Sequence, residues 1–240
     1  MSSSSTTTPY AHAVVPATTP RRFGVRPLIG ALAIAGASIV GASFVDGPTA
    51  AAFVAEPLPR NALAEETSGA AKMALAALDQ YETTDEYDAL IDYLTWRSAT
   101  AIFAAQQLGY DTEEMERAWA VTPMTHQRAV IAAMTQVGVP YRSHSSVEGV
   151  GFDCSGLTSY AWGRAGQELY RQSGTQIREA APLDRSTARA GDLVHYPGHV
   201  MIYLGVGDAI VHSVHSGRTV EVDTISERRR NTVNFGDPTS

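Results

Sequence analysis

The chain has 240 residues, of which 44% are hydrophobic and 18% charged, so it can bury one good core together with a small additional region. Its formal net charge is −7, and its basic run, Arg228 to Arg230, has the length of a solvated turn. Binding to a phosphate backbone depends on clustered Lys and Arg, so this charge balance argues against nucleic acid as a partner.

The beginning of the chain, residues 1–55, has the order of an export signal. A Ser/Thr/Pro-rich start is followed by Arg21, Arg22 and Arg26 and then by an uncharged run over residues 28–45. This run has 18 residues, the lower limit of a membrane-spanning helix, and its many Ala, Gly and Ser residues make membrane insertion weak. We therefore predict cleavage and an extracellular or cell-wall location. An uncleaved segment that tethers the chain to the membrane is the alternative.

The next region, residues 56–122, has the pattern of a linker followed by helices. An Ala-rich helix is predicted first, and the spacing of Thr83 and Glu86 is that of a capping box ahead of a second helix that ends at Gly109. A third, shorter helix is predicted to begin at Asp111. The apolar stripes of these helices are explained by packing on one another or on the next domain.

Cys154 is the single cysteine of the chain. Exported proteins usually use cysteines in pairs, so an unpaired one is a buried inert residue, an intermolecular linker or a reactive nucleophile. The preceding Asp153 is a natural N-cap, which places Cys154 in the first turn of a helix. A helix N-terminus contributes roughly 0.3–1 kcal/mol, up to about 2, whereas lowering a thiol pKa by two units takes about 2.7 kcal/mol. We therefore expect a neighbouring imidazolium to supply the remainder.

The C-terminal region, residues 123–240, begins with a predicted helix and ends with predicted strands. The strands cover residues 191–196, 199–204, 209–213 and 220–222, and the second and third are joined by a hairpin loop.

The hairpin register brings two histidines together. If Leu204 faces Ala209, then Met201 faces His212. Because side chains alternate along a strand, His199 shares a face with Met201 and becomes a diagonal neighbour of His212. Such a pair suits a base and the partner that orients it.

Several segments of this region occur in an order that resembles one family. They are Pro140-Tyr141, Phe152 to Leu157, Ser173 with Gln176, Gly191 to Val194, His199 to Gly205 and Ile210 to His212. Together they resemble the landmarks of NlpC/P60 peptidases, over about Met124 to Ile225. The resemblance implies a papain-like α+β domain, with a Cys-bearing helix packed on an antiparallel sheet. It also implies hydrolysis of amide bonds in peptidoglycan stem peptides, often between D-γ-glutamate and a diamino acid.

The resemblance also implies a role for individual residues. By position, Cys154 is the nucleophile, His199 the base and His212 the polar third residue, and the substrate-binding residues are Tyr141, Asp153 and Ser155. Many relatives carry a Trp-Gly-Gly segment where this chain has Arg142 to Ser145, so the bond that is cut stays open. No cofactor is implied, and we expect a monomer.

Two other functions fit parts of the pattern. A zinc site could use Cys154, His195, His199 and His212 as ligands. The i, i+4 spacing of His195 and His199 brings two imidazoles onto one face in the way that zinc binding needs only in a helix, and the β-branched and aromatic residues around them favour strands. A catalytically inactive wall-binding scaffold is the second alternative. His195 and His215 are interpreted as structural or solvated residues.

Overall fold

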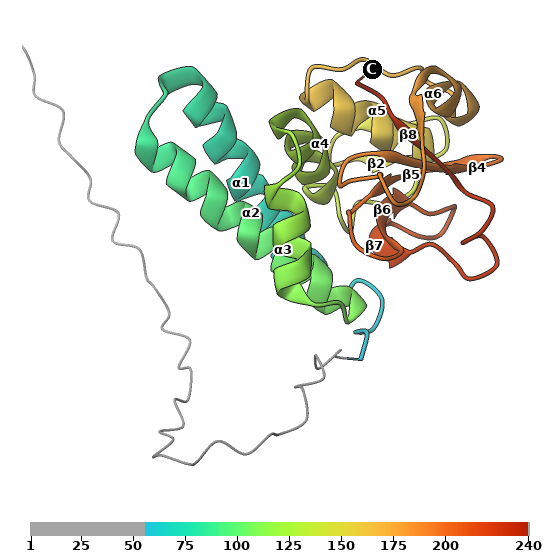
Figure 1. The fold of residues 1–240 in the computed structure, drawn as a ribbon, viewed down its shortest axis with the longest axis horizontal. Helices are drawn as coiled ribbons and strands as arrows, with labels where there is room; N and C mark the ends of the chain where they lie inside the picture. Colours follow the sequence, from blue (N-terminus) through green and yellow to red (C-terminus); the bar gives the residue numbers. More distant parts are fainter. Residues whose placement is uncertain (1–55, 240) are drawn as a thin grey trace, which may run out of the picture. The chain divides into compact units, whose positions relative to one another are not determined.

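The computed structural model describes residues 56–239, so the export signal predicted for residues 1–55 lies outside the described residues. Within the described part of the chain, no helix combines the length and apolar character needed to cross a membrane. Within the described residues the first elements are helices, and all elements from residue 181 to residue 237 are strands, which gives the α+β fold that the sequence predicts (Figure 1).

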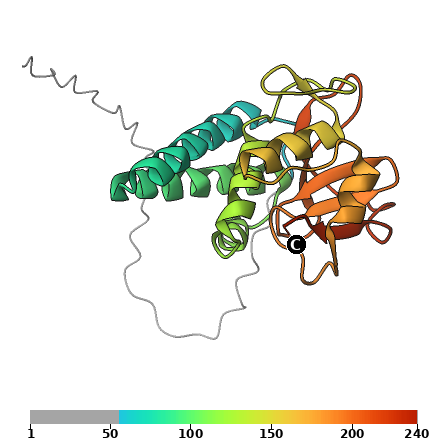
Figure 2. The same ribbon diagram turned by 90° about the horizontal axis from the view of Figure 1, so that it is seen from above.

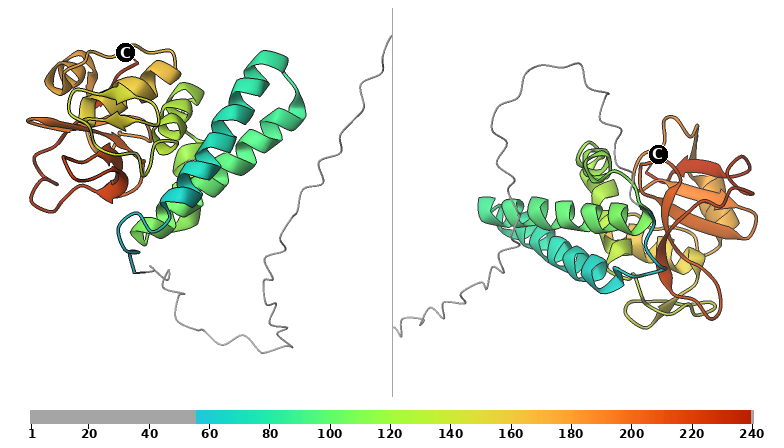
Figure 3. Two further views of the ribbon diagram at one scale, coloured as in Figure 1. Left: turned by 180° about the vertical axis from the view of Figure 1, so that it is seen from behind. Right: turned by 90° about the horizontal axis from the view of Figure 1, so that it is seen from below.

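The helices at the beginning of the described chain pack as a group. They are α1 (Ala64–Thr84), α2 (Tyr87–Leu108), α3 (Thr112–Ala120) and α4 (Met124–Met134). Helices α1 and α2 lie side by side, and α4 contacts both α1 and the later helix α5 (Cys154–Arg164), as Figure 2 and Figure 3 show. The helix that carries Cys154 is thus connected to the N-terminal helices through α4.

The ends of these helices agree in part with the sequence signals. Gly109 ends α2 in the left-handed conformation, with φ of 71°, and Asp111 caps α3 by accepting a hydrogen bond from the Glu114 N–H at 2.8 Å. The predicted capping box is wrong, because α1 continues through Thr83 and the Thr83 hydroxyl donates to a carbonyl one turn earlier. Glu86 is itself the N-cap of α2.

The strands form one main sheet and a small hairpin. The main strands are β3 (Ala181–Leu183), β4 (Leu193–Tyr196), β5 (His199–Tyr203), β6 (Ala209–Ser213), β7 (Val220–Thr224) and β8 (Asn234–Asp237). Within residues 56–239 they make a six-stranded antiparallel sheet with the order β3-β8-β4-β5-β6-β7. The predicted strands correspond to β4 through β7. The sequence does not predict β3 and β8, which are short and contain Pro182 and Gly236.

Two further strands and one helix surround the start of α5. Strands β1 (Ser146–Val147) and β2 (Gly151–Phe152) pair antiparallel in the segment that leads to Cys154. Helix α6 (Ser173–Glu179) follows α5 and contacts it, as well as β4 and β5 of the main sheet.

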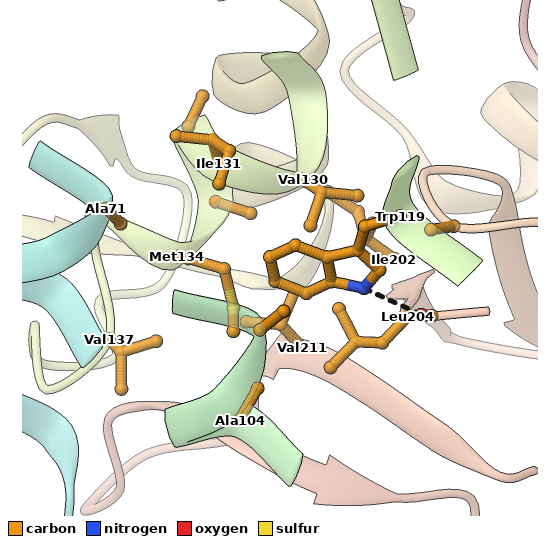
Figure 4. Close-up of a cluster of buried hydrophobic side chains, with 14 of the residues drawn as sticks. Ala71, Ala104, Trp119, Val130, Ile131, Met134, Val137, Ile202, Leu204 and Val211 are labelled. Carbon is orange, nitrogen blue, oxygen red and sulfur yellow. Dashed lines mark hydrogen bonds between the residues drawn. The ribbon is translucent and has the colours of Figure 1, made fainter. Parts of the chain in front are cut away.

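A single buried cluster joins the N-terminal helices to the sheet (Figure 4). Trp119 of α3 is almost completely buried in it, and its indole Nε1 donates a hydrogen bond to the carbonyl of Leu204 at 2.9 Å. Ala104 of α2 belongs to the same cluster. The helical region predicted at residues 56–122 and the domain predicted at residues 123–240 therefore share one core.

The first described residues are also tied to the sheet. The Asn61 side-chain amide donates to the Thr219 hydroxyl at 2.8 Å and to the Val220 carbonyl at 3.3 Å. The Gln107 side-chain amide donates to the Pro59 carbonyl at 3.0 Å. The segment predicted as a linker is therefore held against β7 and the end of α2.

Candidate active site

Cys154 is the first residue of α5, and the backbone before it defines where the helix starts. Asp153 is the N-cap, as predicted, and its Oδ1 accepts a hydrogen bond from the Gly156 N–H at 2.8 Å. A Cβ atom at position 156 would lie only 2.0 Å from the Ser145 carbonyl oxygen. Glycine at this position therefore lets the preceding loop press against the first turn of α5, while Cys154 stays half-buried.

Arg171 organises the two residues that flank the cysteine. Its Nη1 donates to Asp153 Oδ1 at 2.9 Å and to the Ser155 hydroxyl at 2.8 Å, and its Nη2 donates to Asp153 Oδ2 at 2.7 Å. Burial by itself would raise the pKa of Asp153, but Arg171 and the Gly156 N–H lower it below its ordinary value. Asp153 is therefore an anion near neutral pH. Sequence reasoning misses Arg171, because an arginine in a loop before a helix carries no pattern that links it to a distant carboxylate.

His199 and His212 come together across β5 and β6, as the predicted register requires. Ile202 pairs with Val211, which puts Met201 opposite His212. His199 Nε2 lies 2.9 Å from His212 Nδ1, and the two ring centroids are 5.1 Å apart with the planes at 77°. Both histidines are only 8% exposed. Helix α5 contacts both strands, so the helix that carries the thiol and the histidine pair belong to one region.

Burial controls the protonation of His199. Removal from water is the main reason that the pKa of His199 is lowered from 6.5 to about 3, and His212, His195 and His215 contribute smaller lowering effects. His199 is therefore neutral near neutral pH and can accept a proton. The imidazolium expected beside Cys154 is not the state that this environment favours in the free protein, because burial penalises the charged ring.

Tyr196 links the surroundings of Cys154 with those of His199. The Tyr196 ring centroid lies 5.2 Å from that of His199, with the planes tilted by 34°. Burial raises the pKa of Tyr196 and the charge of Cys154 raises it further, whereas Arg229, whose guanidinium lies 4.5 Å from the ring centroid, lowers it. Tyr196 thus contacts the ring of His199 and lies within electrostatic reach of Cys154. Sequence reasoning misses Tyr196, because a tyrosine at a strand end looks like an ordinary packing residue.

Tyr141 lies beside the start of α5. Its backbone forms an isolated bridge with Phe152, two residues before the cysteine. Burial raises the pKa of the Tyr141 phenol, and the charges of Asp153 and Cys154 raise it further. The structure therefore brings Tyr141 within electrostatic reach of both residues.

His195 and His215, which the sequence indicates as structural or solvated residues, have different surroundings. His195 is buried, and neither of its ring nitrogens has a hydrogen-bond partner among residues 56–239. Burial lowers the pKa of His195, so its ring is neutral near neutral pH. His215 is exposed, and its Nδ1 lies 2.8 Å from the Ser216 carbonyl oxygen.

The zinc alternative requires a cluster of Cys154, His195, His199 and His212, but the residues of the described chain that lie close enough to hold a metal ion are different ones. Among the described residues, the group close enough to do so consists of His126, Asp192 and Asp237. His126 Nε2 lies 3.2 Å from Asp192 Oδ1 and 3.3 Å from Asp237 Oδ1, and Arg189 donates to Asp237 Oδ2 at 2.8 Å. These carboxylates already accept hydrogen bonds from protein donors. The cluster is therefore explained as a buried polar interaction that connects α4 with β8.

Comparison with known proteins matches residues 138–235 to the model of the NlpC/P60 family. The chain is 35% identical to murein DD-endopeptidase MepH of Escherichia coli in an alignment of 109 residues that covers 39% of this chain and 38% of that protein. It is 36% identical to a probable endopeptidase of Corynebacterium glutamicum over 132 residues, or 54% and 60% of the two chains. It is 35% identical to a gamma-D-glutamyl-L-lysine dipeptidyl-peptidase of Bacillus cereus in an alignment of 94 residues that covers 36% of this chain and 28% of that protein.

The matched part of the chain contains both α5 and the histidine-bearing strands β5 and β6. The chain spans between 28% and 60% of the length of these three relatives, so the similarity concerns a part of each. Residues 138–235 of the chain are therefore similar to the NlpC/P60 family.

Proposed function

We propose that the chain is an exported cell-wall hydrolase, a cysteine endopeptidase that cleaves amide bonds in peptidoglycan stem peptides between D-γ-glutamate and a diamino acid. The domain family supports this proposal, as do relatives that are named as endopeptidases and one named for the γ-D-glutamyl-L-lysine bond. The observation that carries it is the 2.9 Å contact between His199 Nε2 and His212 Nδ1, because a catalytic base needs a partner that fixes its ring.

The first half of the reaction forms a thioester. His199 Nε2 is in hydrogen-bond contact with His212. Nδ1 of His199 is therefore the nitrogen that accepts the proton of the thiol. This nitrogen accepts the proton of Cys154 while the sulfur attacks the amide carbon and the carbonyl electron pair moves to oxygen. N–H groups at the start of α5 stabilise the oxyanion. His199 then passes its proton to the leaving amine as the carbon–nitrogen bond breaks.

The second half releases the acid product. A water molecule gives a proton to His199 and attacks the thioester carbon, and the carbon–sulfur bond breaks to release the Cys154 thiolate, which recovers the proton. His199 is cationic only between proton transfers, which agrees with an environment that lowers the pKa of its ring to about 3.

Tyr141, Asp153 and Ser155 are the proposed substrate-binding residues. Their support is their position around the first turn of α5, where Arg171 contacts both Asp153 and Ser155. An ionised Asp153 accepts hydrogen bonds from substrate N–H groups, and the hydroxyls of Tyr141 and Ser155 donate to carbonyl oxygens.

Digestion of isolated peptidoglycan tests the proposal. The purified full chain is incubated with wall fragments, and mass spectrometry identifies the new peptide termini. New γ-D-glutamyl carboxyl ends that are absent with Cys154→Ala support the proposal, and a different terminus corrects the bond that is cut. Binding to the wall without any new terminus would favour the non-catalytic scaffold. Loss of activity to a chelator, with recovery on added zinc, would contradict the cysteine mechanism.

A further inference from the structure

The second ring nitrogen of His212 faces a carboxylate that is not part of the proposed Cys-His-His site. His212 Nε2 lies 3.6 Å from Asp223 Oδ2. This nitrogen is buried and has no hydrogen-bond partner within residues 56–239. At 3.6 Å the contact is electrostatic, and a movement of roughly half an ångström would make it a hydrogen bond.

The neighbouring acid, Glu221, is not available to this ring. Glu221 lies directly opposite His212 in the register of β6 and β7. However, both of its oxygens are used by Arg218, whose Nε donates to Oε1 at 2.7 Å and whose Nη2 donates to Oε2. Arg60 adds a second cation, 3.6 Å from Oε2. Asp223, one diagonal position along the same face of β7, is the acid that is left to face His212.

The Asp223 carboxylate is both oriented and charged. Its Oδ1 accepts a hydrogen bond from the Thr224 N–H at 2.7 Å, which leaves Oδ2 for His212. Burial by itself would raise the pKa of Asp223, but His212, the Thr224 N–H and the charge of Arg218 lower it below its ordinary value. Near neutral pH the group is therefore an anion, which can only accept hydrogen bonds.

The hydrogen between the two histidines can be arranged in two ways. If His212 is protonated on Nδ1, it donates to His199 Nε2, and neutral His199 must then carry its own proton on Nδ1, where it cannot take one from a thiol. If His212 is protonated on Nε2, it accepts from the His199 Nε2–H, and His199 Nδ1 keeps a free lone pair. An anion at His212 Nε2 favours the second arrangement, because it attracts a proton to that nitrogen.

We propose that Asp223 is a positioning residue that keeps a proton of His212 on Nε2, so that His212 Nδ1 accepts from the His199 Nε2–H and His199 Nδ1 stays free to accept the proton of Cys154. The catalytic meaning of this inference rests on the proposed function. The tautomers themselves do not, since they can be measured without substrate.

Nitrogen NMR of the histidine-labelled full chain measures these tautomers near neutral pH, with signals assigned from His199→Gln and His212→Gln. In the wild type we expect both rings to carry the proton on Nε2. In Asp223→Ala we expect His199 to show a substantial Nδ1–H population, and in Asp223→Asn an intermediate one, because the amide can accept or donate. Glu221→Gln is the matched control, since it removes a carboxylate from the same face of β7 and should leave the tautomers unchanged.

Kinetics on a stem peptide give the second measurement. Asp223→Ala should lower kcat about tenfold with little change in KM, because it acts on the base and not on the substrate. Added to His212→Ala, it should lower kcat no further. Wild-type His212 protonated on Nδ1, or the same tautomers in Asp223→Ala as in the wild type, would overturn the inference. Tautomers that change as expected in a protein that cuts no peptide would support the role of Asp223 and defeat the proposed function instead.

Discussion

Arg171 holds both oxygens of the Asp153 carboxylate, with Nη1 to Oδ1 at 2.9 Å and Nη2 to Oδ2 at 2.7 Å. Asp153 is at the same time the N-cap of α5, the helix that begins with Cys154. An arginine from the segment before α6 thus fixes the side chain that starts the cysteine helix, and the stability of that start can be tested separately from the chemistry.

Arg171→Ala should lower the free energy of unfolding by about 1 kcal/mol, because Asp153 loses its cation but keeps the hydrogen bond from the Gly156 N–H. Turnover should fall as well, since Ser155 loses a partner in the same change. Urea-induced unfolding measures the first effect. Arg178→Ala is the control, because Arg178 forms an exposed pair with the adjacent Glu179 and should change stability by less than about 0.5 kcal/mol. Equal losses from both variants would contradict a special role for Arg171.

Two glycines of α5 should respond in opposite directions to alanine. Gly156→Ala places a Cβ against the Ser145 carbonyl, so we expect a loss of about 1–3 kcal/mol and displacement of the loop before Cys154. Gly163 has open space around it, and Gly163→Ala should gain up to about 1 kcal/mol from helix propensity. Thermal unfolding of the two variants checks this. A stable Gly156→Ala protein with full activity would show that the loop can move away at little cost.

Trp119→Ala should destabilise the whole described unit, and not only the N-terminal helices. It removes a buried indole from the shared core and leaves the Leu204 carbonyl without this donor, so the expected loss is about 3–5 kcal/mol. Val121→Ala, at a position that is 81% exposed, is the nearby control. Unfolding followed by near-ultraviolet circular dichroism and by peptidase activity should give coincident curves. Separate transitions for the helices and the sheet would argue against one cooperative core.

Cys154→Ala should abolish turnover and leave the fold intact, because it removes a small half-buried side chain and no disulfide. His199→Ala should lose nearly as much activity, and the double variant should be no worse than either single one, since nucleophile and base act as a unit. Rates on a soluble stem peptide, together with circular dichroism of each variant, make the measurement. Substantial activity in Cys154→Ala would exclude it as the nucleophile.

His199 should make the protein less stable as the pH falls. Its pKa is about 3 in the folded chain, against about 6.5 when unfolded, so between these values the unfolded state binds a proton that the folded state does not. Stability therefore rises with pH in this window, by at most about 1.4 kcal/mol per pH unit from this residue. The lowered pKa of His195 adds in the same direction.

Urea unfolding between about pH 5 and 7 separates the contribution of these histidines from that of the carboxylates, because the carboxylates with lowered pKa values lose their contribution only at more acidic pH. His199→Gln should flatten the dependence. A variant whose stability changes with pH as steeply as that of the wild type would assign the effect to other groups.

Local rules explain which parts of the site the sequence predicts. The N-cap at Asp153 depends on a few consecutive residues, and the contact of His199 with His212 follows from one short hairpin and strict side-chain alternation. The contact between Arg171 and Asp153 spans 18 residues and depends on how a loop closes over a helix, which no periodicity encodes.

The protonation state of His199 could not be predicted for a different reason. Strand alternation tells which face a side chain occupies but not how deeply the surrounding elements bury it, and depth is what lowers the pKa of this ring. The same limit applies to Asp223. Strand register puts Glu221, and not Asp223, directly opposite His212, and only the arginines that bind Glu221 leave the diagonal acid to face the ring.

The hydrogen bond from Asn61 to Thr219 joins residues 158 positions apart, near the two ends of the described chain. Closing a loop of that length costs chain entropy before any contact repays it, so such contacts slow folding. The contact cannot form until the polypeptide through β7 has been made. Because Asp223 and the Thr219–Val220 anchor of Asn61 both belong to residues 219–224, a chain that has been synthesised only as far as β6 lacks both the anchor of Asn61 and the carboxylate that faces His212.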